Sequence, residues 1–146
     1  MEKTLATFAD FEAEAGRFVD ALLRGTQGAT LVTLSGELGA GKTAFTKAVA
    51  SKLGVGEVVT SPTFVLEKIY LLGGETAKFG RLVHIDAYRL ESGKDLAALG
   101  FDELMQDSGN LILLEWPEKV AEALPEPAVH ISIVANPDES RTIVYG

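Results

Sequence analysis

The sequence predicts an α/β fold in which a mostly parallel β-sheet with antiparallel additions is flanked by helices. Two observations indicate this fold class. Short runs rich in Val, Ile and Leu alternate with segments of helical periodicity, as in sheets whose parallel strands are joined by helices. Other strand-like runs lie close enough together to form hairpins. With 146 residues, 47% of them hydrophobic, the chain is expected to form a single domain over residues 1–146.

The first part of the chain is predicted to form a short strand at residues 4–8 and then a helix. Apolar side chains recur at helical spacing over residues 11–23. Asp10 is expected to cap the start of this helix, because its carboxylate can accept hydrogen bonds from free backbone N–H groups. Gly25 is expected to end it, because glycine readily adopts the left-handed conformation that follows many helices.

A strand, a glycine-rich loop and a second helix are predicted next. Residues 30–34 (TLVTL) are typical of a buried strand, and residues 42–54 (KTAFTKAVASKLG) predict a helix that ends at Gly54. Two β-rich runs follow at residues 63–72 and 81–90. The short glycine-containing segment between them favours a hairpin over a helical crossover, so these strands are expected to pair antiparallel.

The second half of the chain is predicted to complete the sheet. Periodicity and turn residues indicate two short helices, a buried strand, a brief helix that starts at Pro117 and a closing hairpin. These elements are expected at residues 94–99, 102–106, 111–116 and 117–124, with the hairpin strands at residues 128–136 and 141–146.

Residues 36–43 read GELGAGKT and match G-x-x-x-x-G-K-[ST], the P-loop pattern, between a predicted strand and a predicted helix. In such a loop backbone N–H groups surround a phosphate, and the helix presents its positive end. Lys42 is expected to reach the β- and γ-phosphates, and the Thr43 hydroxyl to ligate Mg²⁺. The alternative is a glycine-rich turn with an incidental lysine. The predicted phosphate-binding residues are Gly36, Glu37, Leu38, Gly39, Ala40, Gly41, Lys42 and Thr43.

Two carboxylates follow predicted buried strands, Asp86 after LVHI and Glu115 after LILL. A magnesium–nucleotide site requires a carboxylate at the end of a neighbouring strand. Strand alternation also places His84 and Tyr88 on the face that carries Asp86. This polar face is expected to border the phosphate site. Alternatively, the three side chains form a structural group in which Asp86 bonds to Arg89 or to the backbone, and Glu115 is a solvated strand end.

A further candidate lies in TSPTF, at residues 60–64, between the second helix and the next strand. Switch GTPases place a threonine in this connection, where the γ-phosphate and Mg²⁺ order it. Thr63, or Thr60, is a candidate for this part, and Pro62 stiffens the approach to the strand. An ordinary turn would have the same composition.

Composition and charge exclude several classes of function. The net charge of −8 argues against a direct, sequence-independent grip on DNA or RNA, which depends on Lys and Arg. The absence of Cys excludes disulfides and thiolate nucleophiles. No apolar run approaches the ~18 residues of a membrane span, so no membrane contact and a cytoplasmic location are expected. The five arginines are scattered, with no cluster to clamp a transferring phosphoryl group.

Taken together, GELGAGKT, SPTF, HIDAYRL and LLEWP, in this order and in a chain this short, resemble the TsaE family. The resemblance covers roughly residues 5–145. It implies a P-loop NTPase fold with ATP and Mg²⁺ and the activity of a small ATPase in bacterial synthesis of N6-threonylcarbamoyladenosine at position 37 of tRNA. The implied partners are TsaD and TsaB, and tRNA is implied only through that complex.

The resemblance also implies roles for individual residues. It places phosphate binding at residues 37–43, with Lys42 among the catalytic groups, and Mg²⁺ at Thr43 and Glu115. It suggests a switch-like Thr63 and an Asp86 near the attacking water. Adenine is implied near Ala9 and Arg141, between the N-terminal segment and the last strands. Glu37 and Ala44 depart from the residues that many members have, Asp and Thr, and leave Thr43 unaffected.

Three other functions share the loop. A small-molecule kinase would require an acceptor pocket and a lid, for which the chain is short. A non-hydrolysing scaffold would use ATP only to order a segment that recruits a partner. A GTPase is disfavoured because no N-K-x-D tetrapeptide, which reads guanine, is present. The sequence therefore favours a slow, partner-dependent ATPase.

Overall fold

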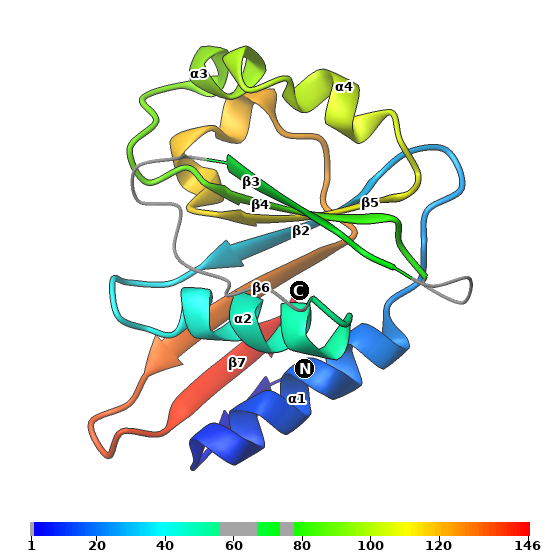
Figure 1. Ribbon diagram of the computed structural model, residues 1–146. Coiled ribbons are helices and arrows are strands. Elements are labelled where there is room, and N and C mark those ends of the chain that lie inside the picture. The colour runs from blue at the N-terminus through cyan, green and yellow to red at the C-terminus, as the bar shows by residue number, and fades with distance from the viewer. Residues whose placement is uncertain (1, 56–66, 74–77) are drawn as a thin grey trace.

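The computed structural model describes residues 2–55, 67–73 and 78–146, which form a seven-stranded sheet with helices on both faces (Figure 1). The strands are β1 (Glu2–Leu5), β2 (Thr30–Ser35), β3 (Glu67–Leu71), β4 (Arg81–Asp86), β5 (Asn110–Glu115), β6 (Val129–Ala135) and β7 (Arg141–Tyr145). The helices are α1 (Phe8–Ala21), α2 (Lys42–Lys52), α3 (Gly93–Ala98) and α4 (Phe101–Met105), with 3₁₀ turns η1 (Pro117–Lys119) and η2 (Ala121–Ala123).

The sheet has the spatial order β1-β7-β6-β2-β5-β4-β3. Its centre is parallel, since β2 pairs with both β5 and β6, and β4 pairs with β5. Its margins are antiparallel, through the pairs β3–β4, β6–β7 and β1–β7. The predicted mostly parallel sheet with antiparallel additions is thus confirmed. Because parallel strands end at the same edge of a sheet, the register brings Leu34, Glu115 and Asp86 side by side.

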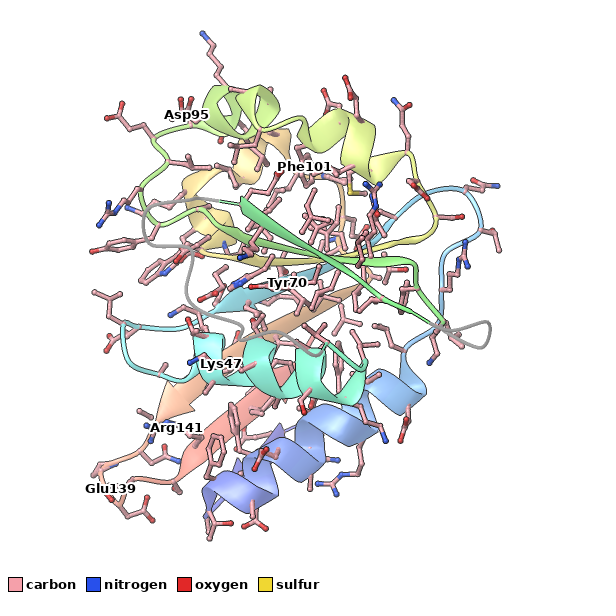
Figure 2. All side chains as sticks on the ribbon, viewed as in Figure 1. Lys47, Tyr70, Asp95, Phe101, Glu139 and Arg141 are labelled. Carbon is pink, nitrogen blue, oxygen red and sulfur yellow. The ribbon has the colours of Figure 1, made fainter. Side chains whose placement is uncertain are left out.

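A hydrophobic core lies on each face of the sheet. Helices α1 and α2 cover one face, where Phe45 packs against Phe11 and Phe18 with ring centroids 5.8 and 5.6 Å apart. Helices α3 and α4 cover the other, through Leu96, Phe101 and Leu104 (Figures 1 and 2). The parallel strands are apolar on both faces because both are covered, which explains the unbroken runs of Val, Ile and Leu in the sequence.

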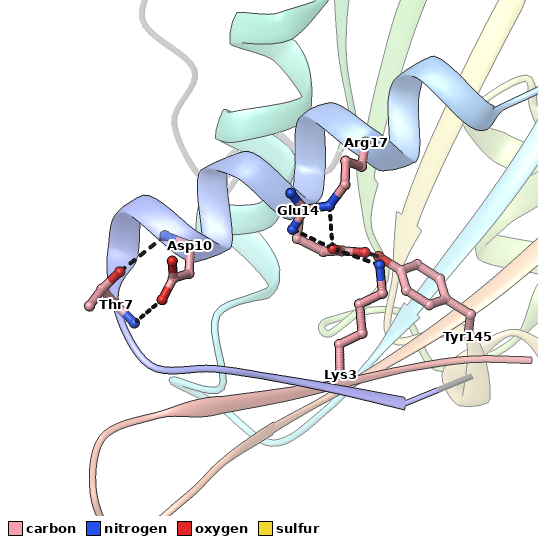
Figure 3. Close-up of polar contacts among 6 residues, drawn as sticks. All are labelled: Lys3, Thr7, Asp10, Glu14, Arg17 and Tyr145. Carbon is pink, nitrogen blue, oxygen red and sulfur yellow. Dashed lines mark hydrogen bonds and ion pairs between the residues drawn. The ribbon is translucent and has the colours of Figure 1, made fainter.

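The start of α1 differs from the expectation in two details. The strand predicted at residues 4–8 is β1, which ends at Leu5. The N-cap is Thr7, whose hydroxyl accepts a hydrogen bond from the backbone N–H of Asp10, while the Asp10 carboxylate accepts from the N–H of Thr7 (Figure 3). The prediction of Asp10 as the cap was therefore wrong by three residues, because Asp10 is the distal member of a reciprocal capping box.

The end of α1 was also placed too late. The helix ends at Ala21, where the buried Leu22 adopts an extended conformation, so Gly25 is not its terminator. The remaining predicted elements within the described residues are confirmed, including both hairpins. The strand predicted at residues 81–90 ends earlier, at Asp86, so Tyr88 does not belong to it as predicted. The brief helix predicted from Pro117 is a pair of 3₁₀ turns. The first residues of the strand predicted at 63–72, up to residue 66, lie outside the described residues.

Within the described part of the chain, no helix combines the length and apolar character that a bilayer span requires.

Candidate nucleotide-binding site

The glycine-rich loop links the end of β2 to the start of α2, at the edge of the sheet where the parallel strands end. Gly36 has a φ of +153°, and a Cβ there would lie 2.5 Å from the carbonyl oxygen of Ile133, so only glycine allows the loop to pass this close to β6. Gly41, with a φ of +117°, is the N-cap of α2. It has no side chain to cap the helix, so the first backbone N–H groups of α2 are available to an anion.

Lys42 is buried inside this loop. Its side chain is 5% exposed, and its Nζ donates to the carbonyl oxygens of Gly36 and Glu37, the latter at 2.9 Å. Burial lowers the pKa of Lys42, against the attraction of Glu115, Asp86 and Glu118, which acts in the opposite direction. The ammonium group is therefore held near the carboxylates by backbone carbonyls, without a direct ion pair among the described residues.

Glu115 lies at the end of β5 and is 2% exposed. Its Oε2 is hydrogen bonded to Nε2 of His84, which is fully buried on β4. Among the described residues His84 is the only hydrogen-bond partner of this carboxylate. A buried, ionised carboxylate normally requires more donors or a cation, because removal from water is costly. Glu115 thus has capacity for a positively charged ligand.

Asp86 ends β4 in register with Glu115 and is half-buried. Its Oδ1 accepts a hydrogen bond from the backbone N–H of Tyr88 at 3.0 Å. Burial raises the pKa of Asp86, and the nearby Glu115 adds to the rise, while the bond from Tyr88 opposes it. The alternative in which Asp86 bonds to the backbone is therefore realised for one of its oxygens. Because its pKa is raised, its carboxylate accepts a proton more readily than that of an ordinary aspartate.

Trp116, directly after Glu115, contacts both Lys42 of the loop and Tyr88. Nζ of Lys42 lies 4.4 Å from the centroid of its ring, within the range of a cation–π contact. Tyr88, which lies beyond the end of β4, also packs on the indole, with the ring centroids 4.9 Å apart. Trp116 has a φ of +61°, which is rare for an aromatic residue and concentrates at functional sites.

A pocket of about 170 Å³ opens on the other side of the loop, between the start of α1 and the β6–β7 hairpin. Arg141 and Glu139 border it from the hairpin, at the edge of the molecule where α2 begins (Figure 2). Ala9 is exposed on the first turn of α1 and does not line the pocket. The other lining residues are Leu5, Ala6, Thr7, Phe8, Phe11, Gly41 and Ala44.

The donor groups at this edge fit a magnesium–phosphate complex. Within the part of the chain that the structure describes, no three His, Asp or Glu side chains are grouped so that they could hold a metal by themselves. Magnesium bound with a nucleotide requires fewer, since it usually takes one or two protein oxygens besides phosphates and water. Thr43, on the first turn of α2, and Glu115, beside Leu34 at the end of β2, supply two such oxygens.

The structure brings together the predicted residues 36–43, Asp86 and Glu115, and places Arg141 at the neighbouring pocket. Thr63 and Thr60 lie outside the described residues. Two contacts were not foreseen from the sequence, the bond between His84 and Glu115 and the indole over Lys42. The position of Trp116 directly after Glu115 was the available signal for the second.

The family model and the curated relatives that match this chain carry the same family name. A family model described as threonylcarbamoyl adenosine biosynthesis protein TsaE matches residues 9–143. The proteins named tRNA threonylcarbamoyladenosine biosynthesis protein TsaE from Treponema pallidum and Streptomyces coelicolor are 41% and 43% identical to this chain. The first alignment covers 78% of this chain and 79% of the relative, and the second 82% and 76%.

The fold has a counterpart among solved structures. The crystal structure of Bacillus subtilis YdiB superposes with a TM-score of 0.75 at 28% sequence identity, covering 99% of this chain and 83% of that one. The matches extend over both the glycine-rich loop and the two acidic strand ends. The chain therefore belongs to the TsaE family.

Proposed function

We propose that this protein binds ATP with Mg²⁺ and hydrolyses it slowly, as the ATPase component of tRNA threonylcarbamoyladenosine biosynthesis. The observation that carries the proposal is the presence of two buried charged side chains, Lys42 and Glu115, at the sheet edge that holds the glycine-rich loop. The ammonium of Lys42 is held by loop carbonyls, and the carboxylate of Glu115 has one hydrogen-bond partner among the described residues. A nucleotide phosphate and its divalent cation would pair with both.

The chain's own groups would each have a distinct part. Backbone N–H groups of residues 37–43 and the start of α2 would bind the phosphates. Lys42 would exchange its bonds to the loop carbonyls for contacts with the β- and γ-phosphates. Thr43 and Glu115 would hold Mg²⁺, which neutralises the charge that develops on the phosphoryl oxygens. Asp86, whose pKa is raised by burial, would orient the attacking water and accept its proton.

Adenine would occupy the pocket between the start of α1 and the β6–β7 hairpin. Three features support this position: the pocket adjoins Gly41, it is separate from the carboxylate side of the loop, and Arg141 borders it. ATP with Mg²⁺ should therefore raise the melting temperature more than GTP does. A ligand present at 100 times its Kd adds ~2.7 kcal/mol to the free energy of unfolding, which is readily measured.

Slow turnover is expected because no arginine cluster borders the phosphate site in the part of the chain that the structure describes. Arg17, Arg24 and Arg81 are bonded to groups outside it. Switch NTPases without a supplied arginine finger hydrolyse at roughly 10⁻⁴ to 10⁻² s⁻¹, and a partner raises the rate by ~10³ to 10⁵. We expect TsaD and TsaB to be those partners and to hold the tRNA, since a chain with a net charge of −8 is poorly suited to bind it alone.

Reconstitution of tRNA modification with TsaD and TsaB tests the role in the pathway. The Lys42→Ala variant should lose ATP binding and fail to support modification. Lys47→Ala is the matched control, because Lys47 is exposed on the same helix and carries the same charge (Figure 2). Loss confined to multiple turnover would indicate a reset role. Full activity of Lys42→Ala under both single and multiple turnover would contradict the proposal.

A second pair of variants distinguishes an ATPase from a scaffold that binds a nucleotide without hydrolysing it. Glu115→Ala and Asp86→Ala should abolish hydrolysis and leave ATP-dependent assembly with TsaD and TsaB intact if hydrolysis is a separate step. Modification that proceeds at the wild-type rate with both variants would instead favour the scaffold. Phosphorylation of a metabolite, detected by phosphorus NMR, would indicate a kinase.

A further inference from the structure

His84 is fully buried in β4, two residues before Asp86, on the sheet face covered by α1 and α2. In register it lies between Leu113 of β5 and Lys68 of β3. An imidazole in this position is costly unless its nitrogens are hydrogen bonded, and an apolar residue of similar size would fill the space without that cost. A buried histidine here therefore requires a reason other than packing.

The two histidines of the chain differ in how their rings are bonded. His130 uses both nitrogens, Nδ1 with the hydroxyl of Thr33 at 2.6 Å and Nε2 with the hydroxyl of Ser132 at 3.4 Å. His84 bonds through Nε2 to Glu115 alone, and its Nδ1 has no partner among the described residues. His130 is a satisfied structural histidine, whereas the one hydrogen bond of His84 is directed at the candidate magnesium ligand.

The chemistry of the pair fixes the direction of the bond. With Glu115 ionised as a metal ligand, Nε2 of His84 is the donor and Oε2 of Glu115 the acceptor, because an ionised carboxylate only accepts hydrogen bonds. A glutamate side chain loses rotamer entropy when a ligand fixes it in one conformation. A hydrogen-bond partner on a neighbouring strand fixes that conformation before the ligand binds. The bond engages Oε2, and Oε1 is the second oxygen of the same carboxylate.

We propose that His84 is a positioning residue that holds Oε2 of Glu115 and thereby presents Oε1 to the magnesium ion of the bound nucleotide. The inference rests on the proposed function, since it concerns how the carboxylate of that site is oriented. Hydrogen-bond partners of metal ligands typically contribute 10- to 100-fold to metal affinity or activity. His84 acts through Glu115, so its loss should affect the magnesium-dependent part of nucleotide binding and spare the rest.

The test compares two variants that differ by one methylene. The side-chain amide of His84→Gln can take the position of Nε2 and donate to Glu115, whereas that of His84→Asn is too short. The affinity for ATP is measured by isothermal titration calorimetry over a series of Mg²⁺ concentrations and without Mg²⁺. His84→Asn should raise the half-saturating Mg²⁺ concentration 10- to 100-fold and leave ATP binding without Mg²⁺ unchanged. His84→Gln should restore most of the magnesium effect.

Controls separate positioning from folding and from the proposed function. His130→Asn alters the other histidine and should leave the magnesium dependence at the wild-type value. In a Glu115→Gln background, His84→Asn should cause no further change, because the residue through which it acts has lost its charge. Should His84→Asn fail to fold in a thermal melt, His84→Met, which lacks a donor but keeps the length, replaces it.

Equal magnesium dependence in His84→Gln and His84→Asn, whether both normal or both impaired, would overturn the inference and leave the proposed function standing. Absence of magnesium-dependent ATP binding in the wild-type protein would instead overturn the proposed function.

Discussion

Glu14 and Glu115 are equally buried, each 2% exposed, but their surroundings differ. On α1, Glu14 receives Lys3 and Arg17 on Oε2 at 3.1 and 2.9 Å and the hydroxyl of Tyr145 on Oε1 at 2.8 Å (Figure 3). Glu115 receives His84 alone among the described residues. Glu14 thus connects α1 to β1 and β7 through several hydrogen bonds. Glu115 has a single hydrogen-bond partner among the described residues.

This difference has opposite consequences for stability and function. The bonds to Glu14 connect α1 to β1 and β7, so they contribute to the free energy of unfolding. Glu115 costs stability, since an incompletely bonded buried charge is unfavourable. Such sites persist where a ligand uses them. The comparison therefore predicts that substitutions at the two glutamates affect different measurements.

The largest effect is expected for Glu115→Gln. Removal of the charge should lower ATP hydrolysis by roughly 10² to 10³, or about 2.7 to 4 kcal/mol, the cost typical of removing one electrostatic contact to the transition state. The melting temperature should stay the same or rise, because a costly buried charge is gone. Hydrolysis by phosphate release and melting by circular dichroism check both. A large loss of stability with normal hydrolysis would reverse the assignment of the two sites.

Glu14→Gln should show the opposite pattern. Loss of this carboxylate leaves the charges of Lys3 and Arg17 without a partner, but their side chains are 33% and 57% exposed, so solvent reduces the cost. We expect the free energy of unfolding to fall by about 2 to 3 kcal/mol, below the range for a fully buried pair. Urea unfolding measures it. Hydrolysis at low temperature should remain within twofold of wild type, and a larger loss would link α1 to catalysis.

Tyr145→Phe should have a smaller effect of the same kind. It removes the donor to Oε1 of Glu14 and keeps the ring, which stacks on Phe18 with the centroids 6.0 Å apart. A hydrogen bond to a charged group contributes about 1.5 to 3 kcal/mol, and the remaining bonds from Lys3 and Arg17 should hold the loss near the lower end. The same urea titration checks it, and no change would mean that the cations alone suffice.

The smallest effect is on the pH dependence of stability. Burial raises the pKa of Glu14, but the hydrogen bonds from Tyr145, Arg17 and Lys3 outweigh it, so the pKa lies below the ordinary value of a glutamate. A carboxyl group whose pKa is lower when folded stabilises the protein above its unfolded pKa. This contribution is lost as the pH falls from about 4.5 through the folded value.

The unfolding free energies of wild type and Glu14→Gln should therefore differ by a constant amount at neutral pH and converge below about pH 4.5. Urea titrations at a series of pH values provide the measurement. A difference that persists undiminished in acid would show that Glu14 stabilises the fold through packing and not through its charge.

The candidate site was predicted from the sequence more completely than the hydrogen bonds that Glu14 makes with Lys3, Arg17 and Tyr145. The spacing of GELGAGKT is local, and its position between a strand and a helix follows from neighbouring residues. Asp86 and Glu115 could be grouped because parallel strands end at one edge of the sheet, which needs only the fold class. The hydrogen bond from His84 depends on the strand register, which the sequence pattern does not determine.

Glu14 illustrates what a local pattern cannot predict. In the sequence it resembles Glu12, another glutamate of the same helix, which is exposed. Only the packing of β1 and β7, the first and last strands of the chain, against α1 buries Glu14 and supplies its donors. The error in the predicted cap of α1 has a similar cause. Both Thr7 and Asp10 are good capping residues, and the position where β1 ends and α1 begins determines which of them is the N-cap.

We expect the buried Glu115 to bind the cation of a bound nucleotide, in contrast to Glu14. Titration calorimetry of ATP with and without Mg²⁺, on wild type, Glu115→Gln and Glu14→Gln, tests it most directly. Mg²⁺ should tighten ATP binding at least tenfold in wild type and Glu14→Gln and should have little effect in Glu115→Gln. An unchanged magnesium effect in Glu115→Gln, or no ATP binding by the wild-type protein, would contradict it.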